Sequence, residues 1–255
     1  MSGEPVVFLG PTMKAEEART YLKAHYLPPV GQGDVVRAVL DCRPVAIAII
    51  DGVFSQKPAV RHKEILWAMA LGVRVYGASS MGAIRAAELT QCGMIGHGLV
   101  YRWYRRTPFA DDADVAVAMA PVELGAYPLG EAFIDVRLTL KKAERAGVIT
   151  TDLRLLLEQA ARSLHFTELT YDRLIARVGA PHLKTLNDRH FRSWLATEAV
   201  NQKKDDAIAL LKLLSSTMTT QSQSSCSSFE LTDAFAFDLQ SSDLLSRVLK
   251  RNRQS

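Results

Sequence analysis

Val73-Arg74-Val75-Tyr76-Gly77-Ala78-Ser79-Ser80-Met81-Gly82 is the stretch that decides the fold. A short β-rich run leads into four small residues, and an alanine-rich helical pattern then continues to Thr90. This order predicts a strand, a tight turn and a helix, which together form part of a parallel β-α unit. Small side chains suit the turn because the helix must pass close to the strand that precedes it.

Two apolar runs lie upstream of this unit, Pro5 to Leu9 and Val45 to Ile50. Both are short and apolar at successive positions, as parallel strands buried on both faces are. Helical patterns cover 13–24, 34–40 with Asp34 as N-cap, and 60–71. Strands that alternate with helices predict an α/β fold, a Rossmann-like parallel sheet with flanking helices.

The C-terminal half differs, because helical patterns dominate it. We expect helices over 131–146, 151–163, 167–178 and 191–214. Seven serines, three threonines and two glutamines fill 215–228, which predicts a linker, and a short docking helix can follow within 229–248. The chain therefore divides into an α/β core with the site (1–130), a helical region (131–214), a linker (215–228) and a C-terminal tail (229–255).

The composition narrows the possible functions. A net charge of +4 over 255 residues is too small to indicate a nucleic-acid partner. The three cysteines lack a metal-binding spacing, so we expect neither a disulfide framework nor a zinc site. We find no signal peptide and no apolar run long enough to span a membrane, so the predicted location is cytoplasmic. No cofactor or metal is expected.

Ser80 is the first candidate catalytic residue. A serine held on a strand-to-helix turn, with backbone N–H groups beside it, is the context of a nucleophile elbow. Two other readings of the same residues stay open. The helix N-terminus can bind an anion, with Ser79 among the binding groups, or Ser79 or Ser80 can simply cap the helix.

A second group of ionisable residues follows the preceding predicted strand. Asp51 ends that strand, and His62, Lys63 and Glu64 open the next helix. His62 is the predicted general base for Ser80, oriented by Asp51 or Glu64. The alternative is a solvated first helical turn.

Further charged residues occupy predicted helices. Arg85 and Glu88 stand three residues apart on the alanine-rich helix, where charges are costly to bury and often have a purpose. Arg137 is a further candidate cation from the helical region. The acidic cluster at 111–114 favours a loop and a helix cap over a metal site.

Two segments each have two interpretations. The aromatic and basic run 101–106 is interpreted as a partner-facing edge or a half-buried strand. Asp114 to Met119 is interpreted as a strand or an amphipathic helix.

Taken together, several segments resemble the TfuA-like family, over roughly residues 45 to 150. The resemblance is carried by Ile50 to Phe54, Pro58 to Leu66, Gly77 to Leu89, Gly93 to Gly96, Tyr101 to Arg106 and Asp111 to Val117. The long combined pattern is specific in a way that a lone serine-x-glycine is not.

The resemblance implies a partner of a YcaO-type enzyme in peptide backbone thioamidation. It further implies a hydrolase that releases sulfide from the thiocarboxylated C-terminus of a ubiquitin-like sulfur carrier protein, with the precursor peptide as a further candidate partner. In that chemistry Ser80 attacks the thiocarboxylate carbonyl or positions a water for the attack, and the N–H groups of Met81 and Gly82 stabilise the oxyanion. His62 moves the proton.

Lys63 and Arg85 would then bind the terminal group of the carrier.

Two alternatives belong to other classes of protein. One is a non-catalytic accessory protein that binds and assists the YcaO enzyme or its peptide substrate. The other is an anion- or nucleotide-binding module built on the helix that follows Ser80.

Overall fold

The computed structural model describes residues 3–54, 57–107, 110–179, 188–217 and 229–252. Five parallel strands form one sheet in the order β2-β1-β3-β4-β5. The strands are β1 (Val6–Phe8), β2 (His25–Leu27), β3 (Ala46–Ile49), β4 (Arg74–Gly77) and β5 (Ile95–Gly96). The predicted α/β class with a parallel sheet is confirmed, and so are the three predicted strands.

The two strands that the sequence did not predict lie at the edges of the sheet. β2 has three residues, none of them buried, and β5 has two. Segments this short and this exposed carry no hydrophobic run that a sequence pattern can detect.

The strand order sets the position of the site. β1 pairs with β2 on one side and with β3 on the other, so the chain changes direction across the sheet between β1 and β3. In open α/β sheets, ligands bind outside the carboxyl ends of the strands at such a switch point. The residues that follow these two strands include Gly10 and Thr12 after β1 and Asp51 after β3.

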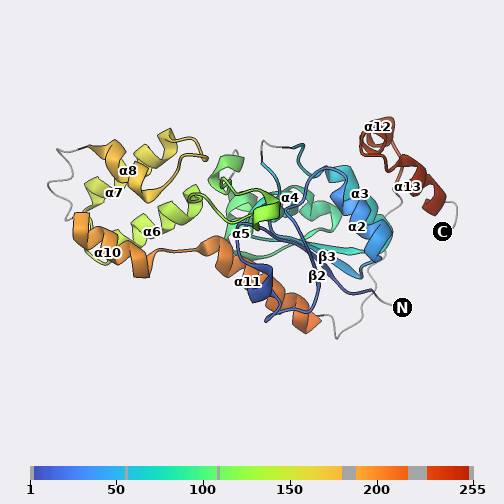
Figure 1. The fold of residues 1–255 in the computed structure, drawn as a ribbon, viewed down its shortest axis with the longest axis horizontal. Helices are drawn as coiled ribbons and strands as arrows, with labels where there is room; N and C mark the ends of the chain where they lie inside the picture. The colour runs from blue at the N-terminus through green and yellow to red at the C-terminus, as the bar shows by residue number, and fades with distance from the viewer. Residues whose placement is uncertain (1–2, 55–56, 108–109, 180–187, 218–228, 253–255) are drawn as a thin grey trace.

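Helices cover both faces of the sheet (Figure 1). In chain order the helices of the α/β part are α1 (Ala15–Ala18), α2 (Asp34–Cys42), α3 (His62–Ala70), α4 (Met81–Leu89) and α5 (Gly98–Arg106). Helices α2 and α3 pack on one face with Ile47, Ile49 and Val75. On the other face lies α11 (Gln202–Thr217), whose Leu210 and Leu214 contact the cluster around Ala48 and Ile50.

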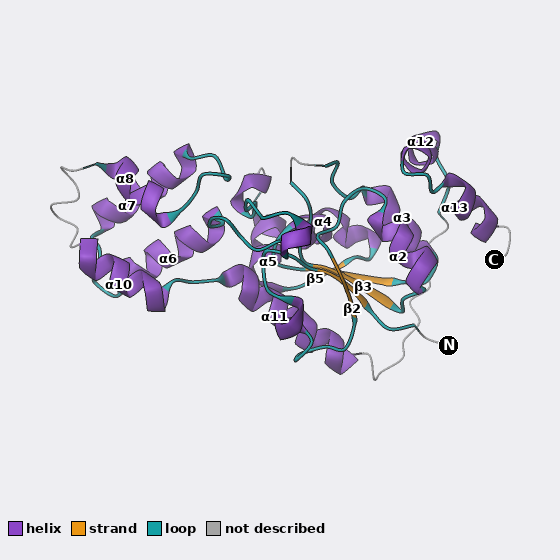
Figure 2. Ribbon diagram, viewed as in Figure 1, coloured by secondary structure: helices purple, strands orange, loops and turns teal. Residues whose placement is uncertain are grey.

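The helical region extends away from the sheet, at the left of Figure 2. It contains α6 (Phe133–Arg145), α7 (Thr151–Ser163), α8 (Tyr171–Val178) and α10 (Asp188–Glu198). These helices share a core of their own around Leu140, Leu157 and Phe191. The chain then returns to the sheet through α11, so the C-terminal helical character predicted from the sequence is confirmed.

The helix predicted over 191–214 is wrong in one respect, because it is two helices. Helix α10 ends at Glu198 and α11 begins at Gln202. The backbone N–H groups of Gln202 and Lys203 donate to Asp135 Oδ1, at 2.8 and 3.3 Å. A carboxylate from α6 thus binds the start of α11, where helix N–H groups lack internal partners.

Four other local predictions are also corrected. The helix expected over 13–24 is the four-residue α1, and Gly33, at φ +85°, is the N-cap of α2 in place of Asp34. The run 101–106 is part of α5 and not a strand. Asp114 to Met119 forms neither a strand nor an α-helix, and a single 3₁₀ turn covers Asp112–Asp114.

The C-terminal tail forms two short helices, α12 (Asp233–Ser241) and α13 (Leu245–Asn252). Their Phe235, Leu239 and Val248 are buried in the same cluster as α2 and α3, so the tail docks on that face. The predicted linker begins inside α11, which continues to Thr217, and 218–228 lie outside the described residues. Within the described part of the chain, no helix combines the length and apolarity needed to cross a bilayer.

Candidate functional site

The turn between β4 and α4 brings strand and helix into backbone contact. A Cβ on Gly82 would lie 1.7 Å from the carbonyl oxygen of Ile49, and one on Gly77 would lie 2.0 Å from that of Gly82. Ser79 is fully buried and has φ +69°, a left-handed conformation that costs a non-glycine residue about 1–3 kcal/mol. The tight turn predicted from the small residues therefore exists, and its strained residue is Ser79.

Asp51 anchors this turn through Thr12. Its Oδ2 accepts the backbone N–H groups of Gly10 and Thr12 at 2.9 and 3.0 Å, and its Oδ1 accepts the Thr12 hydroxyl at 2.6 Å. Thr12 Oγ1 also lies 3.2 Å from Ser79 Oγ. Because the single hydroxyl proton of Thr12 goes to Asp51, Ser79 is the donor in that second bond.

Ser80 and Lys203 meet at one backbone carbonyl. Ser80 Oγ donates to the carbonyl oxygen of Val115 at 3.3 Å, and Lys203 Nζ donates to the same oxygen at 2.8 Å. Both side chains are buried, at 2% and 3% exposure. Thr12, Asp51, Ser79, Ser80 and Lys203 form one buried polar group, which we call the interior cluster.

Buried charges surround Lys203. Burial lowers the pKa of its amine, whereas Asp51 and Asp135 act in the opposite direction by favouring the charged form. Burial also raises the pKa of Asp135 to about 7, against the opposing effect of Lys203. The sequence interpretation missed Lys203, because it stood inside a predicted continuous helix. Asn201, a common helix-capping residue, was the available signal that a new helix starts there.

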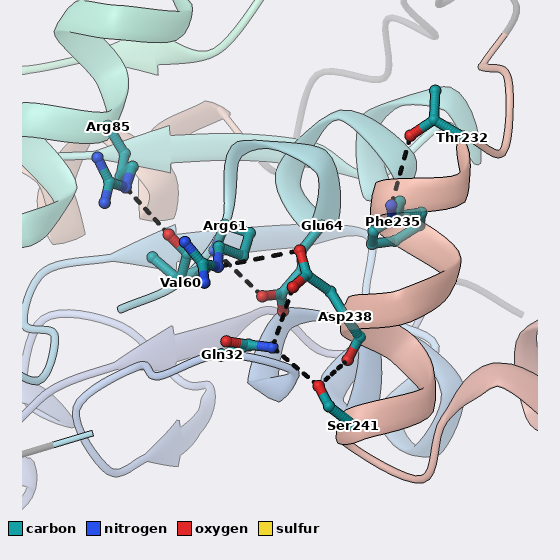
Figure 3. Close-up of polar contacts among 9 residues, drawn as sticks. All are labelled: Gln32, Val60, Arg61, Glu64, Arg85, Thr232, Phe235, Asp238 and Ser241. Atoms are coloured by element: carbon teal, nitrogen blue, oxygen red, sulfur yellow. Dashed lines mark hydrogen bonds and ion pairs between the residues drawn. The ribbon is translucent and has the colours of Figure 1, made fainter. Parts of the chain in front are cut away.

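His62, Arg85 and Glu88 lie together elsewhere, and we call them the surface cluster. His62 Nε2 is 2.7 Å from Glu88 Oε2, and an Arg85 guanidinium nitrogen is 2.6 Å from the same oxygen. Burial raises the pKa of Glu88, but the hydrogen bonds from His62 and Arg85 outweigh it and lower the pKa overall. Arg85 Nε also donates to the carbonyl of Val60 (Figure 3).

The structure does not bring His62 to Ser80. Glu88, the partner of His62, is eight residues beyond Ser80 along α4, which corresponds to about 12 Å of helix. The two carboxylates expected to orient His62 have other partners. Asp51 accepts from Gly10 and Thr12, and Glu64 accepts from the backbone N–H of Arg61 at 3.1 Å.

Three more predicted binding residues have contacts away from the interior cluster. Lys63 Nζ lies 5.8 Å from the ring centroid of Phe229, at the base of the tail. Arg137 pairs with Glu158 at 2.7 Å and stacks over Trp103.

Glu64 Oε1 accepts the backbone N–H of the N-cap residue Arg61 at the start of α3, and burial raises the pKa of Glu64 to about 7. It lies beside α12 in Figure 3, where Asp238 and Ser241 face Gln32.

The predicted oxyanion hole is only half available. The Gly82 N–H donates to the carbonyl of Ile50 at 3.3 Å, so it is already occupied. Met81 is buried in the core cluster through its side chain. Its backbone N–H, in the first turn of α4, has no acceptor among the described residues and is the remaining candidate donor.

The acidic segment 111–114 has the structural role that the sequence favoured. Asp111 Oδ1 accepts the N–H of Ala113, which caps the short 3₁₀ turn, and the buried Asp114 pairs with Arg162. Among the residues that the structure describes, no group of three His, Cys, Asp or Glu side chains is placed to hold a metal ion.

A groove of about 870 Å³ opens beside the interior cluster. Its walls come from 9–17, 26–29 and 122–128, with Asn201 and Lys204 at one side. Thr12 belongs to both the groove and the interior cluster. Leu124 and Tyr127 in the third wall are exposed large hydrophobic residues, at 66% and 49% exposure.

Residues 51–170 match the family of TfuA-like proteins. No curated protein matches the chain. The matched segment includes Asp51, Ser79, Ser80 and Val115, whereas Thr12 and Lys203 lie outside it. The match links the chain to YcaO-related thioamide biosynthesis, and over residues 51–170 the chain is similar to the TfuA-like proteins.

Proposed function

We propose that the protein hydrolyses the thiocarboxylated C-terminus of a ubiquitin-like sulfur carrier protein and so supplies sulfide to a YcaO-type enzyme. The observation that supports this most is the position of Ser80. It begins the helix after a strained turn, at the carboxyl ends of the parallel strands, and it shares a carbonyl with a buried lysine. The match of residues 51–170 to the TfuA-like family favours this reaction over other acyl transfers.

The chemistry is nucleophilic acyl substitution. Ser80 Oγ attacks the thiocarboxylate carbon, the carbon–sulfur bond breaks, and sulfur leaves as hydrosulfide with the hydroxyl proton of the serine. Water then hydrolyses the acyl-serine ester. The Met81 N–H is the donor that we assign to the developing oxyanion, since the Gly82 N–H is used by Ile50.

The groove is the route that we assign to the carrier tail. An extended C-terminal tail fits such a groove better than a folded surface does. Thr12 connects the groove to Ser79 through its hydroxyl. The exposed Leu124 and Tyr127 would then contact the carrier near the base of its tail.

The surface cluster receives a different role in this proposal. His62 and Glu88 are two helical turns from Ser80 and are about 40–47% exposed, so they are accessible to a protein surface. We assign His62, Arg85 and Glu88, with Lys63 nearby, to contacts with a partner protein. Asp51 holds Thr12 and thereby the turn that presents Ser80.

The test is sulfide release from a thiocarboxylated carrier by the wild type, Ser80→Ala and Ser163→Ala. Ser163 is an exposed serine at the end of α7 and serves as the matched control. We expect Ser80→Ala to lose activity by at least about 100-fold, with an unchanged circular dichroism spectrum, while Ser163→Ala keeps wild-type activity. Wild-type activity in Ser80→Ala would contradict the proposal.

The buried state of both serines favours a second candidate, a non-catalytic accessory protein. Ser79 and Ser80 are 0% and 2% exposed, so a substrate reaches them only if the site opens. The exposed Val122, Leu124, Tyr127 and Leu129 would then form the partner surface. If the wild type releases no sulfide but still stimulates thioamidation of a precursor peptide by the YcaO enzyme, this second candidate is correct.

A further inference from the structure

Helix α5 carries three exposed arginines on one face, Arg102, Arg105 and Arg106. They stand three and four residues apart, and at about 100° per residue they fall within an arc of about 100°. None of the three makes a hydrogen bond or an ion pair within the residues that the structure describes, whereas Arg85 and Arg137 each hold a glutamate. We call these three arginines the basic face.

Other parts of the chain hold the helix that carries the basic face. Helix α5 packs against α4 and α11, and it lies beside α4 in Figure 1. Asp206, which is buried, accepts the backbone N–H groups of Leu99 and Val100 at 2.9 and 2.7 Å, at the start of α5. A helix fixed in this way presents its exposed side chains from set positions, which lowers the entropic cost of binding a partner.

The three like charges work against the helix that carries them. Residues three and four apart are neighbours on a helix surface, so Arg102 repels both Arg105 and Arg106. The negative end of the helix dipole favours the last two, which lie in the final turn. No acidic side chain in the described part of the chain pairs with any of the three. An acidic partner would supply the countercharges that the chain itself does not.

The aromatic residues between these arginines do not face outward with them. Tyr101 packs into the core clusters of the α/β part. Trp103 lies 4.9 Å from the Arg137 guanidinium, and the Tyr104 hydroxyl donates to the carbonyl of Asp111 at 2.9 Å. Single-stranded nucleic acid binds to proteins by stacking its bases on exposed aromatic rings as well as by charge. The rings of α5 are already in use, which favours a protein as the acidic partner.

A depression of about 580 Å³ connects the basic face to the surface cluster. Arg105 lines it from α5, and Glu88, a member of the surface cluster, lines it from α4. The basic face therefore extends the surface that we assign to contacts with a partner protein. The groove assigned to the carrier tail is a separate place, because no α5 residue is among the described residues that line it.

We propose that the basic face of α5 docks an acidic surface of a partner protein, which binds while the groove stays open to the carrier tail. This goes beyond the proposed function, which contributes only the choice of partner for the test. That partner is the YcaO-type enzyme, because it is the protein that receives the sulfide.

Two triple variants distinguish the basic face from the net charge of the chain. Both lower the net charge of +4 by three units, and melting temperatures confirm that both are folded. The first variant removes the basic face through Arg102→Gln, Arg105→Gln and Arg106→Gln. The control removes three exposed cations in the last turns of α6, α8 and α13, through Arg145→Gln, Arg177→Gln and Lys250→Gln.

The first experiment measures the Kd for a fluorescein-labelled polyglutamate peptide by fluorescence anisotropy, at about 50 mM salt, where surface charges are weakly screened. We expect the basic-face variant to raise the Kd by about tenfold or more and the control variant by about twofold or less. Equal weakening in both variants would reduce the effect to net charge and overturn the proposal. Tighter binding of oligothymidine of the same length, dependent on the basic face, would also overturn it.

The second experiment measures the Kd for the immobilised YcaO-type enzyme by biolayer interferometry, with and without saturating carrier protein in its carboxylate form. We expect the basic-face variant to raise this Kd by about tenfold or more, the control variant to leave it unchanged, and the carrier to change the wild-type value by less than about twofold. Wild-type binding that is absent, or that does not depend on the basic face, overturns the proposal. Competition by the carrier overturns it as well.

Sulfide release by the same variants separates this proposal from the hydrolase function. We expect the basic-face variant to keep the wild-type kcat and KM for the thiocarboxylated carrier, since α5 does not line the groove. A tenfold rise in KM would assign the basic face to the carrier and overturn the proposal. If the wild type releases no sulfide but the YcaO-type enzyme binds through the basic face, the hydrolase function is refuted and the docking surface stands.

Discussion

The interior cluster and the surface cluster are built on the same helix, two turns apart, and they differ in almost every physical respect. The interior cluster is buried at the start of α4 and joins four separate segments of the chain. The surface cluster lies farther along the helix, where His62 and Glu88 are 47% and 40% exposed, and it joins α3, α4 and the carbonyl of Val60 just before α3. The comparison teaches that nearness in the sequence to a promising motif does not decide which charged residues serve it.

The contributions of the two clusters to the free energy of unfolding should differ as well. Exposed ion pairs contribute about 0–1 kcal/mol, because water and salt screen them and ordering the side chains costs entropy. Buried hydrogen bonds to a charged group contribute about 1.5–3 kcal/mol, and leaving their donors unpaired costs a comparable amount. Substitutions in the two clusters should therefore differ severalfold, and this difference can be measured.

The largest effect should come from Gly82→Ala, because Gly82 packs directly against the backbone of Ile49 beside the interior cluster. The added Cβ would lie 1.7 Å from the carbonyl oxygen of Ile49, and backbone cannot move aside as a flexible side chain can. We expect a loss of more than about 3 kcal/mol in the free energy of unfolding. Denaturant unfolding measures it, with Ala87→Gly as a control for a one-methyl change in the same helix. A loss below 1 kcal/mol would contradict the close contact.

Asp51→Ala should have the next largest effect. It leaves the N–H groups of Gly10 and Thr12 and the Thr12 hydroxyl without their acceptor. We expect the free energy of unfolding to fall by about 2–3 kcal/mol, with Asp51→Asn intermediate because an amide oxygen still accepts. If Asp51→Ala costs no more than Glu88→Ala, the proposed contrast between the clusters is wrong.

The third prediction uses the raised pKa of Asp135, whose carboxyl group accepts the backbone N–H of Lys203. Burial raises this pKa from 3.8 to about 7, so the folded state keeps a proton that the unfolded state has already lost. Stability contributed by Asp135 is therefore present below about pH 4 and is lost as the pH rises to about 7. Asp135→Asn keeps an oxygen for Gln202 and should flatten that decline.

Chemical denaturation of Asp135→Asn and wild type between pH 4 and 8 measures the difference. Glu64, whose pKa burial also raises to about 7, contributes the same sign to both proteins and so cancels. We expect the slopes to differ by up to about 1 kcal/mol per pH unit. Identical slopes would mean that Asp135 is ionised in the folded protein throughout this range.

The smallest effect should come from His62→Ala in the surface cluster. His62 and Glu88 are both substantially exposed, so we expect a change of about 0.5 kcal/mol or less in the free energy of unfolding. That change should shrink further in 1 M salt, where screening acts within about 3 Å. If His62→Ala lowers the free energy of unfolding by more than 1.5 kcal/mol and the loss persists in 1 M salt, His62 is a structural residue. The proposed difference between the two clusters would then be wrong.

Local hydrophobic patterns in the sequence predicted the buried strands, but not the exposed strands or the contacts between distant segments. Val45 to Ile50 is apolar at every position because both of its faces are buried, and the sequence displays this directly. β2 at His25–Leu27 was missed because an exposed three-residue edge strand has no such pattern. The break at residues 199–201 was missed because a carboxylate from Asp135, distant in sequence, determines it.

The candidate site divides in the same way. Asp51 and Ser80 were predicted because each follows a strand, and parallel strands bring their carboxyl ends together. Thr12 and Lys203 were not, since nothing near them in the sequence reveals that they face Asp51 and Val115. His62 was predicted to lie next to Ser80, but helix α3 directs its side chain toward Glu88.

The return of α11 to the sheet also fixes when the fold is completed during synthesis of the chain. Lys203 follows Val115 by 88 residues, with the whole helical region made between them. At about 5–20 residues per second, the ribosome needs several seconds to cover that interval. Throughout that time the nascent chain exposes the apolar sheet face that Leu210 and Leu214 later cover, and its serine has no amine beside it. A partly made chain is therefore a client for chaperones until α11 covers this face of the sheet.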